Sequence, residues 1–385
     1  MDKNGDADII ELMSKLMKIL GVLVLLLGLA VVAAMGKDQP SPGLVFKETG
    51  VSEIKGLYLA GLSGEVLIQG EDWLKLYDQK GKLVWKKDDL KFVTGAGISR
   101  DGQVILYQTS PVPKKGLQIT ELDLIVHLAD RSGQEQLSKP NPYRYFTSQL
   151  SPKGNYIIFG DALAKKIYAH DRAMNPLWDR ESYLWYVGFD PEEKFIYDST
   201  SGLLLNLEGR RVWELPSGMR FLSMSASAEI VLSQPFLTLL QSQKQIYLSS
   251  RVSLEQVILE GYGAGVSYDG GLVAFQGLDR KVQVWRTREL IEKNKGTGKG
   301  SAIWTGEVYL AQLLQFSRDG RSLFVYGETS QGSGKAFLVE FEKSRKLWEK
   351  EWFEAPLKYR MAVSEDNRLL AAQTTPTTVE YYCMK

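Results

Sequence analysis

Cysteine and histidine are almost absent from this chain. Its 385 residues include one cysteine, Cys383, and two histidines, His127 and His170. A single cysteine excludes an intrachain disulfide framework and a thiolate-rich metal site. Two histidines leave little material for a histidine-based metal cluster or for a cysteine and histidine nucleophile pair. We therefore predict that the protein is not an enzyme, and the sequence indicates no catalytic residue, no metal ligand and no cofactor.

Net charge is also nearly absent, because 47 Lys and Arg residues stand against 46 Asp and Glu residues. A balanced chain has no global field of the kind that attracts nucleic acid. Hydrophobic residues make up 44% of the chain and nine residues are Trp, which is typical of an ordered globular protein. We predict protein partners that are recognised through local shape and contacts, and no nucleic acid.

Charged residues are missing altogether from residues 19–35, ILGVLVLLLGLAVVAAM. These seventeen residues are near the lower limit for a helix that crosses the hydrocarbon core of a bilayer. We predict one transmembrane helix here, which would hold the chain in the lipid bilayer. Residues 1–18 are then an N-terminal tail and helix start, and residues 36–43 a linker rich in Pro, Ser and Gly.

A cleaved signal peptide is the alternative interpretation of the same segment. Val32, Ala33 and Ala34 are small residues of the kind that a signal peptidase requires. Against cleavage, the stretch before the apolar core is long and amphipathic, and Asp8 and Glu11 have the spacing of a helix cap. We therefore expect the segment to be retained as a membrane anchor.

Lysines on the two sides of this segment indicate its orientation. Lys3, Lys15 and Lys18 precede it, and Lys37 and Lys47 follow it. This weak excess on the N-terminal side favours a cytoplasmic N-terminus. We predict a single-pass protein of the cell membrane with an extracytoplasmic folded domain, and an inverted arrangement with a cytoplasmic domain is the alternative.

One pattern returns about every 35 to 50 residues, a period that is typical of radial or stacked repeat folds. An apolar run ends in a turn of small or acidic residues, often with Gly, and a run of β-branched and aromatic residues follows, as in a hairpin. Eight such turn segments begin at Leu62, Ile98, Leu150, Phe189, Met224, Val266, Phe316 and Val363.

Most repeats also carry a Trp about 12 to 17 residues before the next turn, on a further predicted strand. These residues are Trp85, Trp178, Trp213, Trp304 and Trp348, and the second and fifth repeats have Leu137 and Ile258 in their place. Four strands in each of eight repeats predict an all-β fold, an eight-bladed β-propeller over residues 44–385, with seven blades as the alternative count.

The two ends of the chain complete one repeat between them. The last repeat ends with TVEYYC at residues 378–383, without a Trp-bearing strand. Residues 44–48, LVFKE, resemble that missing strand, with Phe46 where Trp85 stands in LVWKK. We therefore predict that the N-terminal and C-terminal strands pair and close the propeller, so that neither end leaves an open edge.

Residues 76–85, LYDQKGKLVW, resemble the tryptophan-docking motif of the PQQ-like repeat propellers through Asp78, Gly81, Lys82 and Trp85. That superfamily includes quinoprotein dehydrogenases and scaffolds of BamB-like architecture. The Ser-x-Asp-Gly turns are equally similar to those of WD40-like and TolB-like propellers. The resemblance covers most of residues 44–385 and implies the fold alone, because the cysteine pair that quinoproteins place over their cofactor is missing here.

Two Gly- and Lys-rich segments invite comparison with phosphate-binding loops. In KNKGTGKG, residues 293–300, the Gly expected four residues before Gly298 is missing, and Gly300 stands where Ser or Thr should follow Lys299. We predict a basic connecting loop between two strands of the sixth blade. GSGK, residues 332–335, is interpreted in the same way as a hairpin loop of the seventh blade.

Acidic residues recur at equivalent turns, which indicates turn capping by local hydrogen bonds and not a catalytic pair. The set is Asp190, Glu192, Glu193, Asp269, Asp319 and Asp366. For His127 and His170, which fall in third-strand runs, we expect positions on blade surfaces or in small hydrogen-bonded pockets.

Aromatic residues gather in the segments that link one repeat to the next. We name as a candidate partner-binding rim Tyr143, Tyr145, Tyr183, Trp185, Tyr186, Trp352 and Phe353. In a propeller such links converge near one rim, and exposed Tyr and Trp clusters are typical anchors for protein partners. The competing interpretation is that these rings fill the wedges between neighbouring blades.

These features favour a non-enzymatic interaction scaffold, tethered to the membrane, in a cell-envelope complex. The alternative is a ligand-binding or hydrolytic propeller that uses its central channel for a sugar or a peptide. A cluster of acidic and aromatic residues at one mouth of the channel would favour the alternative, and an apolar plug would oppose it.

Overall fold

Antiparallel β-strands make up most of the structure, a computed structural model that describes residues 43–50, 52–110, 124–141, 143, 148–161, 164–182, 187–198, 201–216, 218–235, 245–296, 300–352 and 360–384. The predicted N-terminal tail, the predicted transmembrane helix and, apart from Gly43, the predicted linker lie outside these residues. Within these ranges no helix is long and apolar enough to span a bilayer.

Five sheets contain four strands each that follow one another along the chain. They are formed by β2 (Gly56–Leu59), β3 (Val66–Gln69), β4 (Leu74–Tyr77) and β5 (Leu83–Lys87); by β6 (Phe92–Ile98), β7 (Val104–Ser110), β8 (Ile125–Asp130) and β9 (Glu135–Pro140); by β10 (Ser148–Leu150), β11 (Tyr156–Asp161), β12 (Lys166–Asp171) and β13 (Pro176–Glu181); by β14 (Val187–Phe189), β15 (Phe195–Asp198), β16 (Leu203–Asn206) and β17 (Arg211–Glu214); and by β25 (Leu310–Phe316), β26 (Ser322–Glu328), β27 (Gly334–Glu340) and β28 (Arg345–Trp352).

A seven-stranded sheet contains β18 (Met219–Met224), β19 (Ile230–Pro235), β20 (Gln245–Ser250), β21 (Gln256–Val266), β22 (Leu272–Gly277), β23 (Lys281–Arg286) and β24 (Trp304–Glu307). The strand β21 is long because it serves both halves of this sheet. Its first part, residues 256–260, pairs with β20, and its second part, residues 261–266, pairs with β22. The sheet therefore consists of two four-stranded halves that share β21.

In the part of the chain that the structure describes, two short helices interrupt the strands. The helix α2 (Thr287–Asn294) lies between β23 and β24, and the 3-10 helix η3 (Phe341–Lys343) lies between β27 and β28. Leu290 and Ile291 of α2 are buried against a hydrophobic cluster that includes Trp285. The prediction of a basic loop over residues 293–300 was therefore wrong at its start, because residues 293 and 294 belong to α2. This helix is amphipathic and packs its apolar side chains against the hydrophobic cluster. Of the segment at 332–335, predicted as a hairpin loop, residues 332–333 lie in the turn between β26 and β27, whereas Gly334 and Lys335 already belong to β27.

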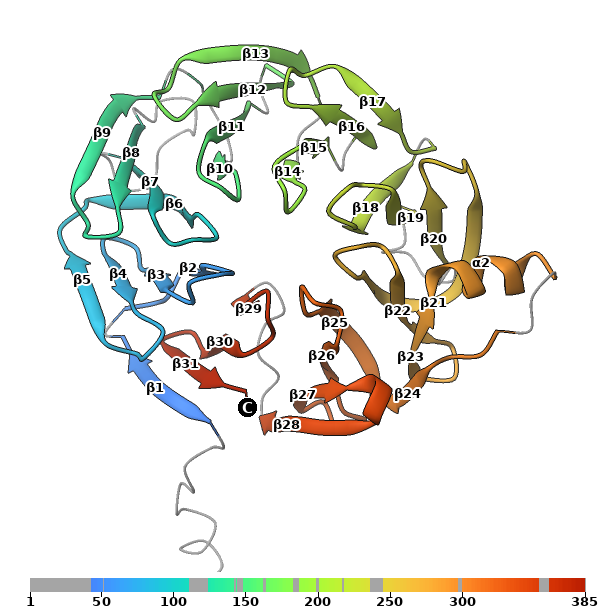
Figure 1. Cartoon of the computed structure of the whole chain (residues 1–385). Helices are drawn as coiled ribbons and strands as arrows, with labels where there is room; N and C mark the ends of the chain where they lie inside the picture. Colours follow the sequence, from blue (N-terminus) through green and yellow to red (C-terminus); the bar gives the residue numbers. More distant parts are fainter. Residues whose placement is uncertain are drawn as a thin grey trace, which may run out of the picture. The chain divides into compact units, whose positions relative to one another are not determined.

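The sheets lie side by side around a common centre, with β2, β6, β10, β14, β18, β25 and β29 (Met361–Val363) nearest to it (Figure 1). Within the described residues, eight hydrophobic clusters lie between successive sheets or sheet halves. Leu67 and Leu76 of one sheet pack against Ile105 and Tyr107 of the next, for example. Each sheet buries both of its faces in this way, so the core is distributed around the ring.

The last sheet joins the two ends of the chain, as predicted. It contains β29, β30 (Leu369–Thr375) and β31 (Thr378–Cys383), and its outer strand is β1 (Leu44–Thr49). The strand β1 pairs antiparallel with β31, with Phe46 opposite Tyr381 and Glu48 opposite Val379. The amide of Cys383 also donates a hydrogen bond to the carbonyl of Gly43 at 2.7 Å. The outer strand of the last sheet therefore comes from the beginning of the described chain.

Aromatic side chains on outer strands dock onto glycines of the following sheet. The indole Nε1 of Trp85 donates to the carbonyl of Arg131 at 3.1 Å, and a Cβ at Gly133 would lie 2.9 Å from the Trp85 ring. Trp178 and Gly209 repeat this arrangement. Phe46 does so against Gly81, where a Cβ would lie 2.6 Å from the phenyl ring. Phe46 thus fills the position of Trp85, as the sequence predicted.

The two repeats without Trp differ from this arrangement and from each other. Leu137 is partly buried against a cluster that contains Met174, the residue in the following sheet that stands where other turns have glycine. Ile258 is exposed. In the second repeat, the small Leu137 on the outer strand is therefore matched by the larger Met174 in the turn. In the fifth repeat, Ile258 is not docked on the next sheet.

Buried glutamines fasten neighbouring sheets closer to the centre. Gln69 donates from Nε2 to the carbonyl of Val93 at 3.0 Å. Gln276 binds the next sheet twice, because its Oε1 accepts from the amide of Ala311 at 2.8 Å and its Nε2 donates to the carbonyl of Val308. These side chains satisfy backbone groups that would otherwise be buried without partners.

The docking of Trp85 predicts a specific cost for Gly133→Ala. The new methyl group would meet the indole ring, and Gly133 also has a φ of +84°. We expect the free energy of unfolding to fall by about 2 to 4 kcal/mol, from overpacking and left-handed strain together. Gly332→Ala is the matched control, because φ is +81° there and no atom lies within 4 Å of the added Cβ. It should cost only about 1 kcal/mol in urea unfolding, and an equal loss in both variants would contradict the docking argument.

Candidate functional site

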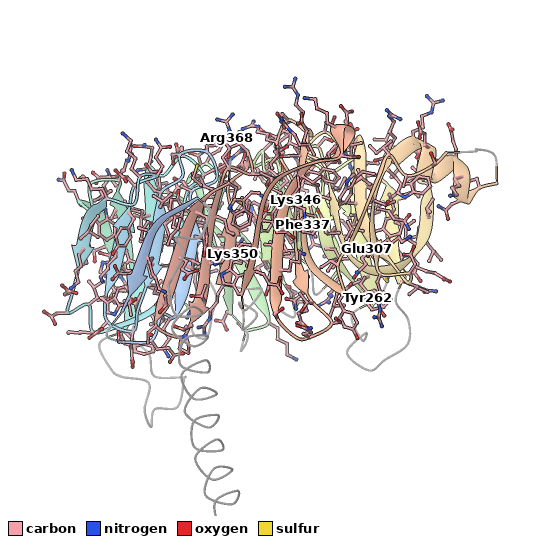
Figure 2. All side chains as sticks on the ribbon, turned by 90° about the horizontal axis from the view of Figure 1, so that it is seen from below. Tyr262, Glu307, Phe337, Lys346, Lys350 and Arg368 are labelled. Carbon is pink, nitrogen blue, oxygen red and sulfur yellow. The ribbon has the colours of Figure 1, made fainter. Side chains whose placement is uncertain are left out.

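The turns between the first and second strands of the sheets share a local design. We call the side of the ring on which they lie the turn face, and they comprise residues 60–65, 99–103, 151–155, 190–194, 225–229, 267–271, 317–321 and 364–368. Figure 2 views the ring from the side, with Arg368 of the last turn at its upper face and Tyr262 at its lower face.

Serine and aspartate fix the shape of four of these eight turns. Ser99 donates from Oγ to Asp101 Oδ1 at 2.6 Å and accepts from the amide of Val104 at 2.9 Å. Asp101 also accepts from the amide of Gln103. The same bonds recur around Ser267, Ser317 and Ser364. With both flanking residues held, the residue after each serine projects from the turn.

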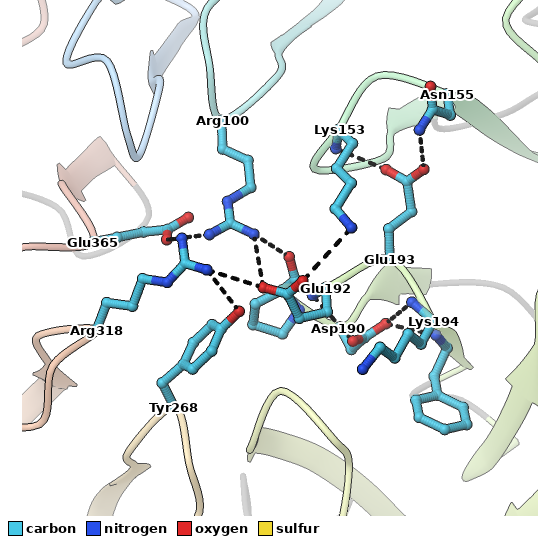
Figure 3. A network of polar contacts seen from close by, with 12 residues as sticks. Arg100, Lys153, Asn155, Asp190, Glu192, Glu193, Lys194, Tyr268, Arg318 and Glu365 are labelled. Carbon is cyan, nitrogen blue, oxygen red and sulfur yellow. Dashed lines mark hydrogen bonds and ion pairs between the residues drawn. The ribbon is translucent and has the colours of Figure 1, made fainter.

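Four charged side chains from turns far apart in the sequence meet at the centre of the ring (Figure 3). Arg100 pairs with Glu365 and lies 3.6 Å from Glu192, measured between Nη1 and Oε1. Arg318 lies 3.2 Å from Glu192 and 3.6 Å from Glu365. Each arginine therefore contacts both carboxylates and each carboxylate contacts both arginines, which closes an alternating circuit. We call these four residues and Lys153, whose Nζ lies 3.6 Å from Glu192, the axial charge network.

Arg100 is the most enclosed member of the axial charge network, with 8% of its side chain exposed. Its Nη1 also donates to the carbonyl of Pro191 at 2.5 Å. Arg318 is 41% exposed, and its guanidinium lies 4.7 Å from the ring centroid of Tyr268, whose hydroxyl is 3.1 Å away. Arg100 thus acts as an internal tie between sheets, and Arg318 is the arginine that solvent reaches.

Backbone hydrogen bonds run from turn to turn around the same centre. The amide of Arg318 donates to the carbonyl of Glu365, and the amide of Glu365 donates to Gly61. Leu62 then donates to Arg100, and Arg100 donates to Pro152. Proline has no amide hydrogen, so Pro152 cannot donate to the next turn. The carbonyl of Pro191 in that turn accepts from the Arg100 side chain instead.

Two acidic residues of the turn at 190–194 lie beside the network, one bonded within this turn and one bonded to the turn at 151–155. Asp190 is buried and accepts from the amides of Glu192, Lys194 and Phe195. Burial raises its pKa above the ordinary aspartate value, although these amides oppose the shift. Glu193 is also buried and binds the turn at 151–155, accepting from the amide of Lys153 at 2.7 Å and from Asn155 at 2.8 Å.

The prediction of turn capping is confirmed for four of the six carboxylates named from the sequence. Asp190 caps its turn as just described, and Asp269, Asp319 and Asp366 accept backbone amides two residues ahead. Glu192 and Glu193 were assigned wrongly. They follow proline in a turn whose cap is already supplied by Asp190, so their side chains are free to reach other sheets.

Sequence reasoning did not single out Arg100, Arg318 or Glu365. All three follow a serine in equivalent turns. Aligning the turns would have shown that opposite charges occupy one position, and such a position in a radial repeat points toward the centre. The sequence alone could not show that two arginines and two carboxylates form ion pairs with one another across the centre of the ring.

Of the predicted aromatic rim, Tyr143 and Trp352 are described, and Tyr145, Tyr183, Trp185, Tyr186 and Phe353 lie outside the described residues. Trp352 is buried between Tyr326 and Tyr382. Tyr143 is partly buried, stacks on Tyr168 with ring centroids 3.8 Å apart, and bonds to His170. Both side chains pack within the ring, and the partner-binding role of the set stays a prediction.

Both histidines lie in hydrogen-bonded pockets, as expected. His170 is buried, with Nε2 2.7 Å from the Tyr143 hydroxyl and Nδ1 3.2 Å from the carbonyl of Met174. His127 lies between Thr109 and Glu135, 2.9 Å from each. Burial lowers the pKa of both imidazoles below the ordinary histidine value.

Comparison of the sequence with known protein families and with curated proteins finds no match. Among the side chains that the structure describes, no group of three or more His, Cys, Asp or Glu residues is arranged to hold a metal ion. The axial charge network is therefore the candidate site that the geometry offers. It combines fixed arginines with partly exposed polar groups.

The position of Arg100 predicts that Arg100→Met destabilises the ring. Glu192 and Glu365 would lose an enclosed partner, and the carbonyl of Pro191 would lose its donor. We expect the free energy of unfolding to fall by about 2 kcal/mol, less than for a fully buried pair because both carboxylates are partly exposed. Arg321→Met, at a side chain 82% exposed in the turn at 317–321, should change it by less than about 0.5 kcal/mol. Equal losses in urea unfolding would refute the role of Arg100.

The buried histidines predict a loss of stability in mild acid. Because their folded pKa values lie below the unfolded value, their contribution is complete above the unfolded pKa, near 6.5, and is lost as pH falls through the folded values. Each histidine can contribute at most about 1.4 kcal/mol per pH unit. In His170→Gln, the free energy of unfolding should fall less steeply between neutral and mildly acidic pH than in the wild type. Superimposable pH profiles would exclude this contribution.

Proposed function

We propose that residues 43–384 form an eight-bladed β-propeller of the PQQ-like or WD40-like kind. The two halves of the seven-stranded sheet, counted separately, bring the number of four-stranded units to eight. The contact of Trp85 with Gly133 supports the PQQ-like assignment, because that motif places an outer-strand Trp on the glycine of a following turn. The pairing of β1 with β31 supports closure.

The function that these features support best is a non-enzymatic scaffold for protein partners in a cell-envelope complex. In this proposal residues 19–35 tether the ring to the membrane, the N-terminus is cytoplasmic and the ring is extracytoplasmic. The axial charge network is the observation that carries the proposal, since it connects turns from five separate sheets at one point. A ring held at its centre and closed at its ends keeps a constant surface for partners.

A ligand-binding ring is the second candidate. Tyr268 and Lys153 are partly exposed beside the arginines, so the centre of the turn face offers polar contacts to a small ligand or a peptide. A mixed set of fixed charges and one aromatic ring is suited to recognition of a polar group.

The scaffold role is tested by capture from native membranes. The full-length protein, tagged at its C-terminus, would be crosslinked in membranes, extracted in mild detergent and recovered. We expect a defined partner in constant ratio to the protein. A control chain carries residues 1–42 fused to an unrelated folded domain, so that capture through the N-terminal segment alone can be recognised. Recovery of a solitary monomer, or of the same proteins with the control, would contradict the proposal.

A further inference from the structure

We propose that the centre of the turn face binds a carboxylate of an acidic peptide segment, with Arg318 and Lys153 as the residues that hold it. In this arrangement Glu192 is an internal competitor that occupies the two cations when no peptide is bound. The inference deepens the proposed scaffold function, because it names the chemistry of one partner contact.

The charge count at the centre is unequal. Arg100, Arg318 and Lys153 supply three positive charges, and Glu192 and Glu365 supply two negative charges. Three cations against two carboxylates leave one positive charge without an ion-pair partner within the axial charge network. The carboxylates of Asp190 and Glu193 lie beside it, but they accept from backbone amides and from Asn155 and form no ion pair with these three cations. A single negative charge would balance it, and one carboxylate is therefore a better match than a doubly charged phosphate group.

The uncompensated charge lies where solvent reaches it. The side chains of Arg318 and Lys153 are 41% and 47% exposed, whereas that of Arg100 is 8% exposed. The two Nη atoms of Arg100 already contact Glu365 and the carbonyl of Pro191. An incoming group would therefore contact Arg318 and Lys153 and leave the internal tie in place.

The ion pairs of the exposed cations are long. Arg318 and Lys153 lie 3.2 and 3.6 Å from Glu192, whereas a charge-assisted hydrogen bond between such groups is about 2.7 to 2.9 Å long. Glu192 is shared among three cations, so it cannot approach all of them closely. A second carboxylate would let Arg318 form shorter bonds, and Tyr268 already contacts the guanidinium through its ring and its hydroxyl.

The internal ligand indicates the class of the external one. Glu192 and Glu365 show that the arginines of this site accept planar carboxylates, which match the guanidinium fork. A glutamate or aspartate side chain of a partner presents the same group, and neighbouring acidic residues in a flexible segment would raise its encounter rate.

The test uses full-length protein in mild detergent and two fluorescent peptides, hexaglutamate and hexaglutamine, with binding followed by anisotropy at low salt. The wild type should bind hexaglutamate and not hexaglutamine. Glu192→Gln should bind hexaglutamate about fivefold more tightly, because the competitor loses its charge. Arg318→Gln should bind at least about tenfold more weakly, which corresponds to about 1.4 kcal/mol.

Arg321→Gln is the matched control, since Arg321 lies in the same turn as Arg318 but outside the axial charge network. Its affinity should equal that of the wild type, and a loss as large as that of Arg318→Gln would overturn the proposal by showing nonspecific attraction. If Arg318→Gln does not fold, as judged by circular dichroism, Lys153→Gln replaces it and should weaken binding. Unchanged affinity in a folded variant, or absence of hexaglutamate binding in both the wild type and Glu192→Gln, would also overturn it.

Inorganic phosphate serves as a second probe. If phosphate binds at this centre more tightly than hexaglutamate and the difference disappears in Arg318→Gln, the carboxylate assignment is wrong. Partner capture with Arg318→Gln separates this inference from the scaffold function. If a partner is still captured but the peptide does not bind, the peptide site is wrong and the scaffold function stands. If the peptide binds but no partner is captured, the peptide site stands and the scaffold function is wrong.

Discussion

The pairing of β1 with β31 is the interaction on which the rest of the ring depends. Every other sheet is built from strands that are consecutive in the sequence. The last sheet takes its outer strand, β1, from the beginning of the described chain, and it packs against the first sheet through a hydrophobic cluster to which β1 also contributes. Without β1, the outer edge of β31 would be open and the cluster that contains Val66 and Tyr381 would lose Val45 and Phe46. An unpaired strand edge next to exposed apolar surface is a template for aggregation. Closure therefore converts a row of hairpins into a structure in which each sheet stabilises the next.

Different kinds of contact join neighbouring sheets at different distances from the centre, and the spacing between the sheets explains which kind occurs at each distance. At the outside the sheets diverge, and large rings such as Trp85 and Trp178 fill the gap against glycine. Farther in, the sheets are close enough for one amide side chain, and Gln69 and Gln276 bond directly to the neighbouring backbone. At the centre the turns nearly touch, so backbone amides and long charged side chains reach across. The stabilising free energy of the ring is thus distributed over many modest contacts between sheets, with no single dominant core.

Some of these contacts could be predicted from the sequence and others could not. The repeat, the turn caps, the pairing of the ends and the role of Phe46 depend on local pattern, and all were predicted. The docking of Trp85 was accessible through resemblance to a repeat family. Gln69 and Gln276 stand at the ends of apolar strands, yet their partners lie in the next sheet and only the fold reveals them. The axial charge network is harder still, because Arg100 and Glu365 are 265 residues apart and a charged turn residue is ordinarily solvated. The helix α2 was missed because its apolar stripe is only two residues long.

The prolines at 152 and 191 explain why the charges gather where they do. Around the turn face, four successive turns each donate one backbone amide to the next, and Arg318, Glu365, Leu62 and Arg100 are the donors that follow this rule. At Pro152 the rule fails for a covalent reason, since the ring nitrogen has no hydrogen to give. The carbonyl of Pro191 would then be an acceptor without a donor at a place where water is partly excluded, which costs free energy. Arg100 supplies that donor from its side chain, and an arginine drawn to the centre needs carboxylates nearby, which Glu192 and Glu365 provide. A gap in the backbone series thus accounts for the enclosed arginine, and the enclosed arginine accounts for the carboxylates that Arg318 and Lys153 then share.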